Sequence, residues 1–331
     1  MSTVHRDSIV VDVHTHPVGF IPQPARSLYR LVNRTTMPPD DDFAVLPGAG
    51  VDVVVAKAVG DPVVTRWYRG GASAAVDAQL DKIEAQIARV GGVVVRSAGE
   101  ARAARAAGTP AAILGVEGGD ALGTDVARVD AWHARGVRVV VLVHLGDNQL
   151  GSTCMPWQDY VGPLPKRRRR ALGLSPLGRA VVRRMHEVGI VVDVAHADRR
   201  TVLDIVAESS RPVISSHTGA RALADFPRFL SDEEITAIAG TGGVVGLWPY
   251  CHRGRGVVDM EDLVGHGRHV ADLVGPAHLC IGTDMNGVPG LMRGYRGEAD
   301  LPLVTDALLA AFSDDEVRGI LGENFLRVLA G

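Results

Sequence analysis

Histidine and carboxylate residues stand at the ends of six of the eight short apolar runs in this sequence. These residues are His14, His16, Glu117, His144, His196, His217 and Asp284. Neutral imidazole and carboxylate oxygens are the ligands that zinc, cobalt and manganese prefer in hydrolytic sites. The residue types therefore indicate a centre for divalent metal ions, and the chemistry of such a centre is the activation of water.

Each of these residues also has an ordinary structural explanation. His14 and His16 are two residues apart, so on a strand they project to the same side and can share one ion, but many such pairs bind nothing. A single histidine at a strand end is more often a hydrogen-bonded packing residue. Glu117, between Val116 and Gly118, is harder to explain by packing, because an unpaired buried carboxylate is costly to ionise. Seven suitable residues at strand ends together favour the metal centre.

The elements that must position these residues alternate along the chain. Short β-branched runs alternate with longer amphipathic stretches, a pattern typical of a parallel sheet wrapped in helices. We expect strands over residues 9–13, 51–58, 111–116, 137–143, 190–194, 212–214, 243–247 and 279–281. No Ser/Gly/Pro-rich linker divides them, so we predict one (β/α)₈ TIM-type barrel, and a single metal-dependent hydrolase domain over residues 1–331. The carboxyl ends of barrel strands meet on one rim, which would bring the seven residues together.

Helices are expected between the strands. Residues 73–90 repeat apolar side chains at helical spacing, and similar patterns cover 125–135, 175–188, 200–208, 231–239, 260–273 and the tail 305–329. Capping residues open several of them: Ser175, Ser231 and Ser313. Stretches 22–47, 153–170 and 289–302 do not fit the repeat, and we interpret them either as lids over the active site or as plain surface insertions.

Composition limits the compartment and the partners. The 331 residues are 46% hydrophobic and 22% charged with net charge -3, which gives no overall field toward nucleic acid or an anionic membrane. Cys154, Cys251 and Cys280 form no C-x-x-C pair, and neither a signal peptide nor a membrane span is evident, so a cytoplasmic protein is expected. The basic run from Lys166 to Arg170 lacks interleaved aromatic residues, and a solvated loop or a contact with an acidic partner explains it better than nucleic-acid binding.

Five segments carry a family resemblance. They are VDVHTH (11–16), GVEGG (115–119), VDVAH (192–196), ISSH (214–217) and IGTD (281–284). In sequence and in order they resemble the metal motifs of the membrane (renal) dipeptidase family, peptidase family M19 of the amidohydrolase superfamily. The resemblance covers most of the chain except residues 18 to 108 or so.

The resemblance implies a zinc-dependent dipeptidase with two divalent ions. The first ion would be held by His14, His16, Glu117 and Asp284, and the second by the bridging Glu117 with His196 and His217. A hydroxide bridging the ions would attack the amide carbonyl, and Asp284 would transfer its proton to the leaving amine. His144 would touch the substrate and stabilise the oxyanion, Arg228 would bind its carboxylate, and Tyr250 is assigned to the substrate as well. A homodimer is the family's form.

Three departures from the family pattern leave the substrate open. His16 stands where the family usually has Asp, Phe229 where Asn follows the arginine, and Met285-Asn286 where Phe-Asp is typical. Alternatives to a dipeptide are an acyl-amino acid, a lactam or a lactone, and a metal-binding barrel without catalysis is the non-enzymatic alternative. No Gly-x-Ser-x-Gly elbow or Walker loop supports another class of enzyme.

Overall fold

The computed structural model describes residues 1–34, 37–160 and 172–331. Eight parallel strands close into a barrel, as predicted, in the order β2-β1-β11-β8-β7-β6-β5-β4, with β4 pairing back to β2. The strands are β1 (Val11–Thr15), β2 (Val53–Val59), β4 (Ala111–Glu117), β5 (Val137–Val141), β6 (Val191–Asp193), β7 (Ile214–Thr218), β8 (Val244–Leu247) and β11 (Leu279–Ile281). Three short strands were not predicted: β3 (Val93–Val94) beside the start of β4, and the antiparallel pair β9 (Cys251–His252) and β10 (Arg255–Gly256).

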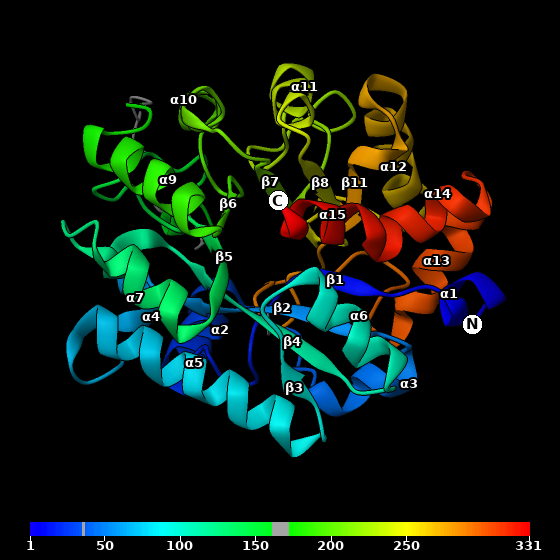
Figure 1. The fold of residues 1–331 in the computed structure, drawn as a ribbon, viewed down its shortest axis with the longest axis horizontal. Helices are drawn as coiled ribbons and strands as arrows, with labels where there is room; N and C mark the ends of the chain where they lie inside the picture. The colour runs from blue at the N-terminus through cyan, green and yellow to red at the C-terminus, as the bar shows by residue number, and fades with distance from the viewer. Residues whose placement is uncertain (35–36, 161–171) are drawn as a thin grey trace.

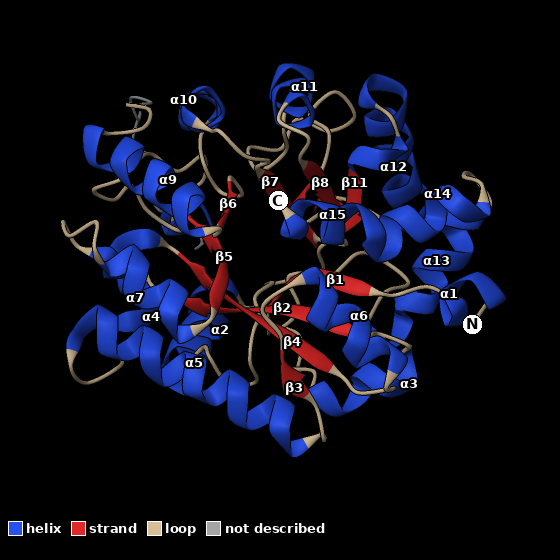
Figure 2. Ribbon diagram, in the orientation of Figure 1, coloured by secondary structure: helices blue, strands red, loops and turns tan. Residues whose placement is uncertain are grey.

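Helices surround this barrel (Figure 1, Figure 2). They are α1 (Thr3–Asp7), α2 (Gln23–Asn33), α3 (Leu46–Ala49), α4 (Pro62–Thr65), α5 (Gly71–Arg89), α6 (Ala98–Ala106), α7 (Arg128–Arg135), α8 (Trp157–Tyr160), α9 (Pro176–Val188), α10 (Arg199–Glu208), α11 (Asp232–Gly240), α12 (Met260–Val274), α13 (Leu301–Leu309), α14 (Asp314–Arg318) and α15 (Asn324–Ala330). Short 3₁₀ turns cover Phe43–Val45, Gly119–Leu122, Pro276–His278 and Glu298–Asp300, and a π-helical turn covers Gly319–Glu323. None of the helices in the described part of the chain is long and apolar enough to cross a membrane.

The three predicted N-caps are confirmed, but the single tail helix over 305–329 is wrong. Ser175, Ser231 and Ser313 each accept a backbone N–H as N-caps, and Ser231 and Ser313 form capping boxes with Glu234 and Glu316. The box at Ser313 is also what divides the tail. Its side chain satisfies the backbone of a new helix, α14, so the chain cannot continue the helix that ended at Leu309.

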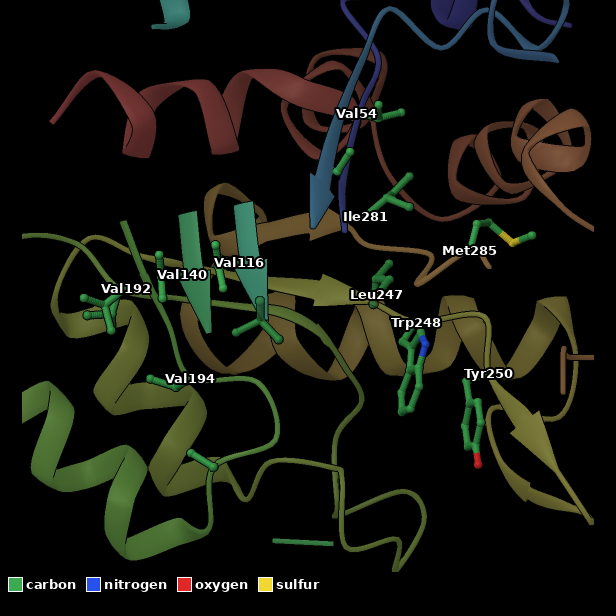
Figure 3. Close-up of a cluster of buried hydrophobic side chains, with 14 of the residues drawn as sticks. Val54, Val116, Val140, Val192, Val194, Leu247, Trp248, Tyr250, Ile281 and Met285 are labelled. Atoms are coloured by element: carbon green, nitrogen blue, oxygen red, sulfur yellow. The ribbon is translucent and has the colours of Figure 1, made fainter. Parts of the chain in front are cut away.

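The core has two parts because successive strand residues point to opposite faces. One set fills the barrel interior, including Val53, Val55, Val191 and Ile214, and packs on α6 and α15. The other set faces the surrounding helices, and Figure 3 shows members of it, such as Val116 and Val140. The C-terminal segment closes the amino ends of the strands, where Asn324 Nδ2 donates to Leu279 O at 2.8 Å. The carboxyl ends are left to carry the site.

Candidate metal centre

The seven predicted residues meet at the carboxyl rim of the barrel. His14 and His217 lie within β1 and β7, and Glu117 is the last residue of β4. His16, His144, His196 and Asp284 follow their strands within a few residues. All seven side chains belong to buried residues, with His144 the most accessible at 8%. Residues as distant as positions 14 and 284 therefore share one enclosed space.

Glu117 lies at the middle of the cluster. Its Oε1 is 3.4 Å from His14 Nε2 and 3.2 Å from His196 Nε2. Its Oε2 is 3.2 Å from His16 Nε2 and 3.4 Å from His144 Nε2. One carboxylate thus faces imidazole nitrogens with both of its oxygens, which is the arrangement that a bridging ligand needs.

Asp284 lies near imidazoles of both sides of the cluster. Its Oδ1 is 3.4 Å from His16 Nε2, and its Oδ2 is 3.9 Å from His217 Nε2. The histidines also approach one another, with Nε2 atoms 3.3 Å apart for His14 and His16 and 3.1 Å apart for His196 and His217. In neutral imidazoles these nitrogens carry lone pairs, which repel each other when they point at the same place. A cation at that place would bind both lone pairs.

Groups behind the rings fix which nitrogen is free. The Nδ1 of His16 lies 2.9 Å from Lys57 O, a carbonyl that can only accept, so Nδ1 donates and Nε2 of the neutral ring is left for a ligand bond. Ser216 Oγ lies 2.8 Å from His14 Nδ1 and 2.9 Å from His217 Nδ1. Asp61 hydrogen-bonds the Nδ1 of His144. These contacts orient four rings toward the centre.

The residues present fit divalent metal ions. Glu117 Oε1 is buried and has no hydrogen-bond partner among the described residues, a state that is costly unless a cation compensates it. Three trios each bring their ligand atoms within 4.8 Å of one another: His14–His16–Asp284, His14–Glu117–His217 and Glu117–His144–His196. The third trio contains His144, which the resemblance places on the substrate. The geometry thus places His144 among the candidate ligands.

The electrostatics of the rings differ across the cluster. Burial lowers the pKa values of His196 and His217 well below the ordinary histidine value, and the charge of Arg228 adds to this, so both rings are neutral and able to ligate. Burial also acts to lower the pKa of His16, but hydrogen bonds to Asp284 and Glu117 outweigh it and raise that pKa to about 9. Burial acts to raise the pKa of Glu117, yet the neighbouring histidines hold it well below its usual range. The carboxylate is therefore ionised.

The backbone is strained at two of the candidate ligands. His196 and Asp284 have φ values of 67° and 56°, in the left-handed region that residues other than glycine rarely adopt. Such a conformation costs of the order of 1–3 kcal/mol and clusters at functional sites. Asn286, at φ 68°, holds the segment that carries Asp284. Its Nδ2 donates to His16 O at 2.7 Å, and its Oδ1 accepts from Asp41 N at 2.7 Å. This departure from the family pattern thus has a structural role.

A polar layer that the sequence analysis missed supports the centre from inside the barrel. Lys57, Asp193 and Ser216 follow the interior residues Val55, Val191 and Ile214 by two positions, so they form the next layer toward the rim. Lys57 Nζ lies 2.5 Å from Asp193 Oδ2 and 3.4 Å from Ser216 Oγ. The signal for Lys57 was a single charge within an otherwise apolar run.

Gly115 leaves the space that the lysine occupies. A Cβ at position 115 would lie 2.8 Å from Lys57 Cγ and 3.0 Å from Val139 O.

Asp61 is a second supporting residue that was not predicted. It follows the second predicted strand, one of the two strands for which no metal-capable residue was named. It caps α4 through Val63 N and holds His144.

A cavity of about 440 Å³ opens onto the cluster. Its floor includes His16, Glu117, His144, His196 and Asp284. All three stretches interpreted as lids or insertions contribute to its wall: α2 and Met37 from the first, Trp157 and Tyr160 from the second, and Pro289 from the third. The basic run from Lys166 to Arg170 lies outside the described residues.

The predicted substrate residues have different positions. Tyr250 lines the cavity and stacks on Trp248 with ring centroids 4.1 Å apart, and Figure 3 shows both after β8. Arg228 is 2% exposed and does not line this cavity; its guanidinium carbon lies 4.9 Å from the centroid of the Trp248 ring. Phe229 is a core residue, packed edge-on against Phe226 at 5.2 Å. Replacement of the family Asn by Phe229 therefore adds to the core.

Comparisons with known proteins agree on one family. The model of the membrane dipeptidase family (peptidase family M19) matches residues 2–331. Dipeptidase tcpJ of Claviceps purpurea (strain 20.1) is 30% identical over 227 residues, which are 67% of this chain and 51% of that protein. An uncharacterized dipeptidase of Schizosaccharomyces pombe is 30% identical over 230 residues, 67% of this chain and 53% of that protein. The chain spans about half the length of these curated relatives.

Solved structures share the fold. A metallopeptidase from Rhodobacter sphaeroides, bound to a phosphinate mimic of the dipeptide L-Ala-D-Ala, has a TM-score of 0.80 with 21% identity and covers 98% of this chain and 99% of its own. An amidohydrolase from Pseudomonas aeruginosa has a TM-score of 0.78 with 23% identity, over 98% and 97% of the two chains. The resemblance seen in the five metal motifs is confirmed by the match over the whole chain: this protein belongs to the membrane dipeptidase family, peptidase family M19.

Proposed function

We propose that this chain, as one domain over residues 1–331, is a metal-dependent hydrolase that cleaves the amide bond of a dipeptide or dipeptide-like substrate at a centre of two divalent cations. The observation that carries the proposal is Glu117, whose carboxylate lies 3.2 to 3.4 Å from imidazole nitrogens of both proposed ligand groups and of His144. Zinc is the expected metal, because the proposed ligands are four histidines and two carboxylates, a set rich in nitrogen.

The ligands divide between two positions in this proposal. His14, His16 and Asp284 hold one cation, His196 and His217 hold the other, and Glu117 is shared. Bound divalent cations supply a water whose pKa is lowered toward neutrality, so that hydroxide is available at physiological pH. All other steps fall to residues of this chain.

Asp284 accepts the proton of the attacking water at a carboxylate oxygen and returns it to the leaving amine. Asp284 faces the cavity and is 7% exposed, so it can reach both the attacking water and the leaving amine. His144 stabilises the developing oxyanion through Nε2, because Asp61 on its other nitrogen holds the ring toward the cavity. Tyr250 contacts the substrate from the cavity wall. The assignment of Arg228 to the substrate carboxylate rests on the family motif alone. The homodimer is carried over from the family as a whole.

The names of related proteins support the substrate class. Relatives are called dipeptidases, and one structural neighbour binds a phosphinate mimic of a dipeptide. A phosphinate imitates the tetrahedral state that water attack on an amide produces, and analogues of that state bind more tightly than substrates.

The test combines metal content with hydrolysis. Purified protein is stripped by a chelator, reloaded with Zn²⁺, Co²⁺ or Mn²⁺, and assayed on a panel of L,L, L,D and N-acyl dipeptides while bound metal is measured by mass spectrometry. We expect two tightly bound ions per chain and metal-dependent amide cleavage. Glu117→Gln should lose both, whereas His133→Gln, a change on α7 away from the rim, should lose neither. Protein that holds no tightly bound ion after reloading, or that cleaves no amide when metal is bound, would contradict the proposal.

A further inference from the structure

We propose that the substrate is an amino acid or dipeptide whose amino group is blocked by an extended apolar acyl chain, in preference to a dipeptide with a free amino terminus. The inference rests on the proposed function and narrows its substrate class. Two independent features of the cavity carry it: the chemistry of its wall and the charges available on its floor.

The wall of the cavity is mostly apolar, and Arg66 is the one charged side chain among the described lining residues outside the candidate metal cluster. Apolar side chains come from six segments of the chain, and they include Phe20, Leu28, Val64, Leu145 and Trp157. The volume of about 440 Å³ lies within the range of roughly 300–1,000 Å³ of pockets that enclose drug-sized ligands. An extended apolar group on the substrate would remove this wall from water.

The apolar surface continues past the mouth into solvent. Leu28 and Val32 of α2 line the cavity yet are 56% and 38% exposed, and Trp67, beyond α4, lines it at 44% exposed. Large apolar side chains that gather on a surface next to a cavity indicate a ligand that covers them. A flexible acyl chain fits this shape, because it extends from the amide at the metal centre along the wall to the mouth.

The floor of the cavity offers no spare charge for a free ammonium group. Among the described residues that line it, the carboxylates are Glu117 and Asp284, and both are assigned to the metal ions. A free α-amino group has a pKa of about 8 and is largely charged at neutral pH, so its burial without a counter-ion is costly. An acylated nitrogen is uncharged and needs only a hydrogen bond.

The inference predicts activity that depends on acyl length. The metallated protein is assayed on N-acetyl-, N-hexanoyl- and N-decanoyl-alanine, each with L- and D-alanine, beside free dipeptides such as Leu-Ala. We expect kcat/KM to rise at least roughly hundredfold from the acetyl to the decanoyl substrate, from burial of the added methylene groups. Free dipeptides should be cleaved more slowly than the decanoyl substrate.

Two variants of α2 separate the cavity wall from the outer surface. Leu28→Ser should lower the ratio of kcat/KM for the decanoyl substrate to kcat/KM for the acetyl substrate about fivefold or more. Leu31→Ser is the matched control, because Leu31 lies on the same helix at 77% exposure and does not line the cavity. If both variants change the oligomeric state in light scattering and neither changes the dependence on acyl length, the apolar surface joins copies of this chain and the inference is wrong.

Binding can be followed without turnover. Three of the four tryptophans line the cavity, namely Trp67, Trp157 and Trp248, so their fluorescence reports on the wall. N-decylsulfonyl-alanine, which has no amide carbonyl to attack, should change this fluorescence at concentrations at least tenfold lower than N-methylsulfonyl-alanine.

The outcomes distinguish this inference from the proposed function. Faster cleavage of free dipeptides than of any acylated substrate, or equal binding of the two sulfonyl compounds, overturns the acyl-chain inference and leaves the hydrolase intact. Absence of all amide cleavage by metallated protein overturns the proposed function, and the fluorescence titration then still decides whether the cavity selects an acyl chain.

Discussion

Lys57 Nζ lies 2.5 Å from Asp193 Oδ2 in the interior of the barrel, beneath the rim that carries the candidate metal ligands. Both side chains are 0% exposed. Asp193 also accepts from Ala195 N and Ser216 N at 3.0 Å each, which ties it to the segments that carry His196 and His217. The pair therefore connects the second barrel strand to the second group of candidate ligands.

Removal of one member of this pair should destabilise the protein. Lys57→Met leaves the Asp193 carboxylate buried without its counter-charge, and we expect a loss of about 3–5 kcal/mol in the free energy of unfolding. Denaturant unfolding of the metal-free protein measures it. The double variant Lys57→Met/Asp193→Leu removes both charges and should recover most of the loss. Equal instability of the single and double variants would show that the pair acts by volume alone.

Asp61→Asn should lower turnover without lowering stability. Asparagine still caps α4, because its carbonyl can accept from Val63 N, but its amide no longer holds His144 by charge. Loss of such a supporting contact typically costs 10–100-fold, and we expect this in kcat. Asp259→Asn makes the same change at the N-cap of α12, which does not line the cavity, and should be neutral in kcat. A loss of melting temperature that accounts for the lost turnover would contradict the assignment.

His186 should make stability depend on pH. Burial, with a smaller effect from Arg211, lowers its pKa from 6.5 to about 4, and its Nδ1 accepts from Ser210 N at 3.1 Å. The unfolded chain therefore takes up this proton first as the pH falls. The stabilisation from neutral His186 is complete above pH 6.5 and is lost as the pH falls from 6.5 through 4.

Thermal unfolding of metal-free protein at pH 7.5 and pH 4.5 tests this effect. His186→Asn keeps an acceptor for Ser210 N but cannot be protonated. We expect its melting temperature to fall by about 2–4 °C less than that of the unchanged protein between the two pH values. His133→Asn, at a half-buried position of α7, should follow the unchanged protein more closely. Identical pH dependence in all three proteins would exclude His186.

His16→Asp should change metal preference. The substitution restores the carboxylate that the family usually has, and oxygen ligands favour harder cations such as Mn²⁺ over Zn²⁺. We expect the ratio of dissociation constants, Kd for Mn²⁺ over Kd for Zn²⁺, to fall by tenfold or more in competitive titrations. His16→Asn, which has an oxygen but no charge, is the control for the loss of the ring. An unchanged ratio would show that His16 is not a ligand.

The metal-capable residues could be predicted because they carry local signals. Apolar β-branched runs specify strands by their own period, and the residues that end them, such as Glu117 and His196, must meet once the barrel closes. Even here the details needed the structure. The β1–β2 register shifts between Asp12 and Thr15, so the simple alternation behind the His14-x-His16 argument is interrupted, although both rings still converge.

The supporting contacts carried little or no such signal. Asp61 and His144 are 83 positions apart, and Lys57 and Asp193 are 136 apart, so no spacing in the sequence relates them. The tail was misjudged for a different reason. Its helical periodicity continues across Ser313, and only the capping box at that residue separates α13 from α14.

The amino-acid sequence by itself determined the strands, the closed barrel and the set of residues at its rim, because these depend on local period and on the rule that parallel strand ends share one face. The tertiary structure decided how Glu117 divides the imidazoles, which groups hold Lys57 and His144, that Arg228 lies outside the cavity wall, and that α2 makes the wall apolar. These features depend on distances between side chains from different strands and loops, and such distances exist only after the chain has folded.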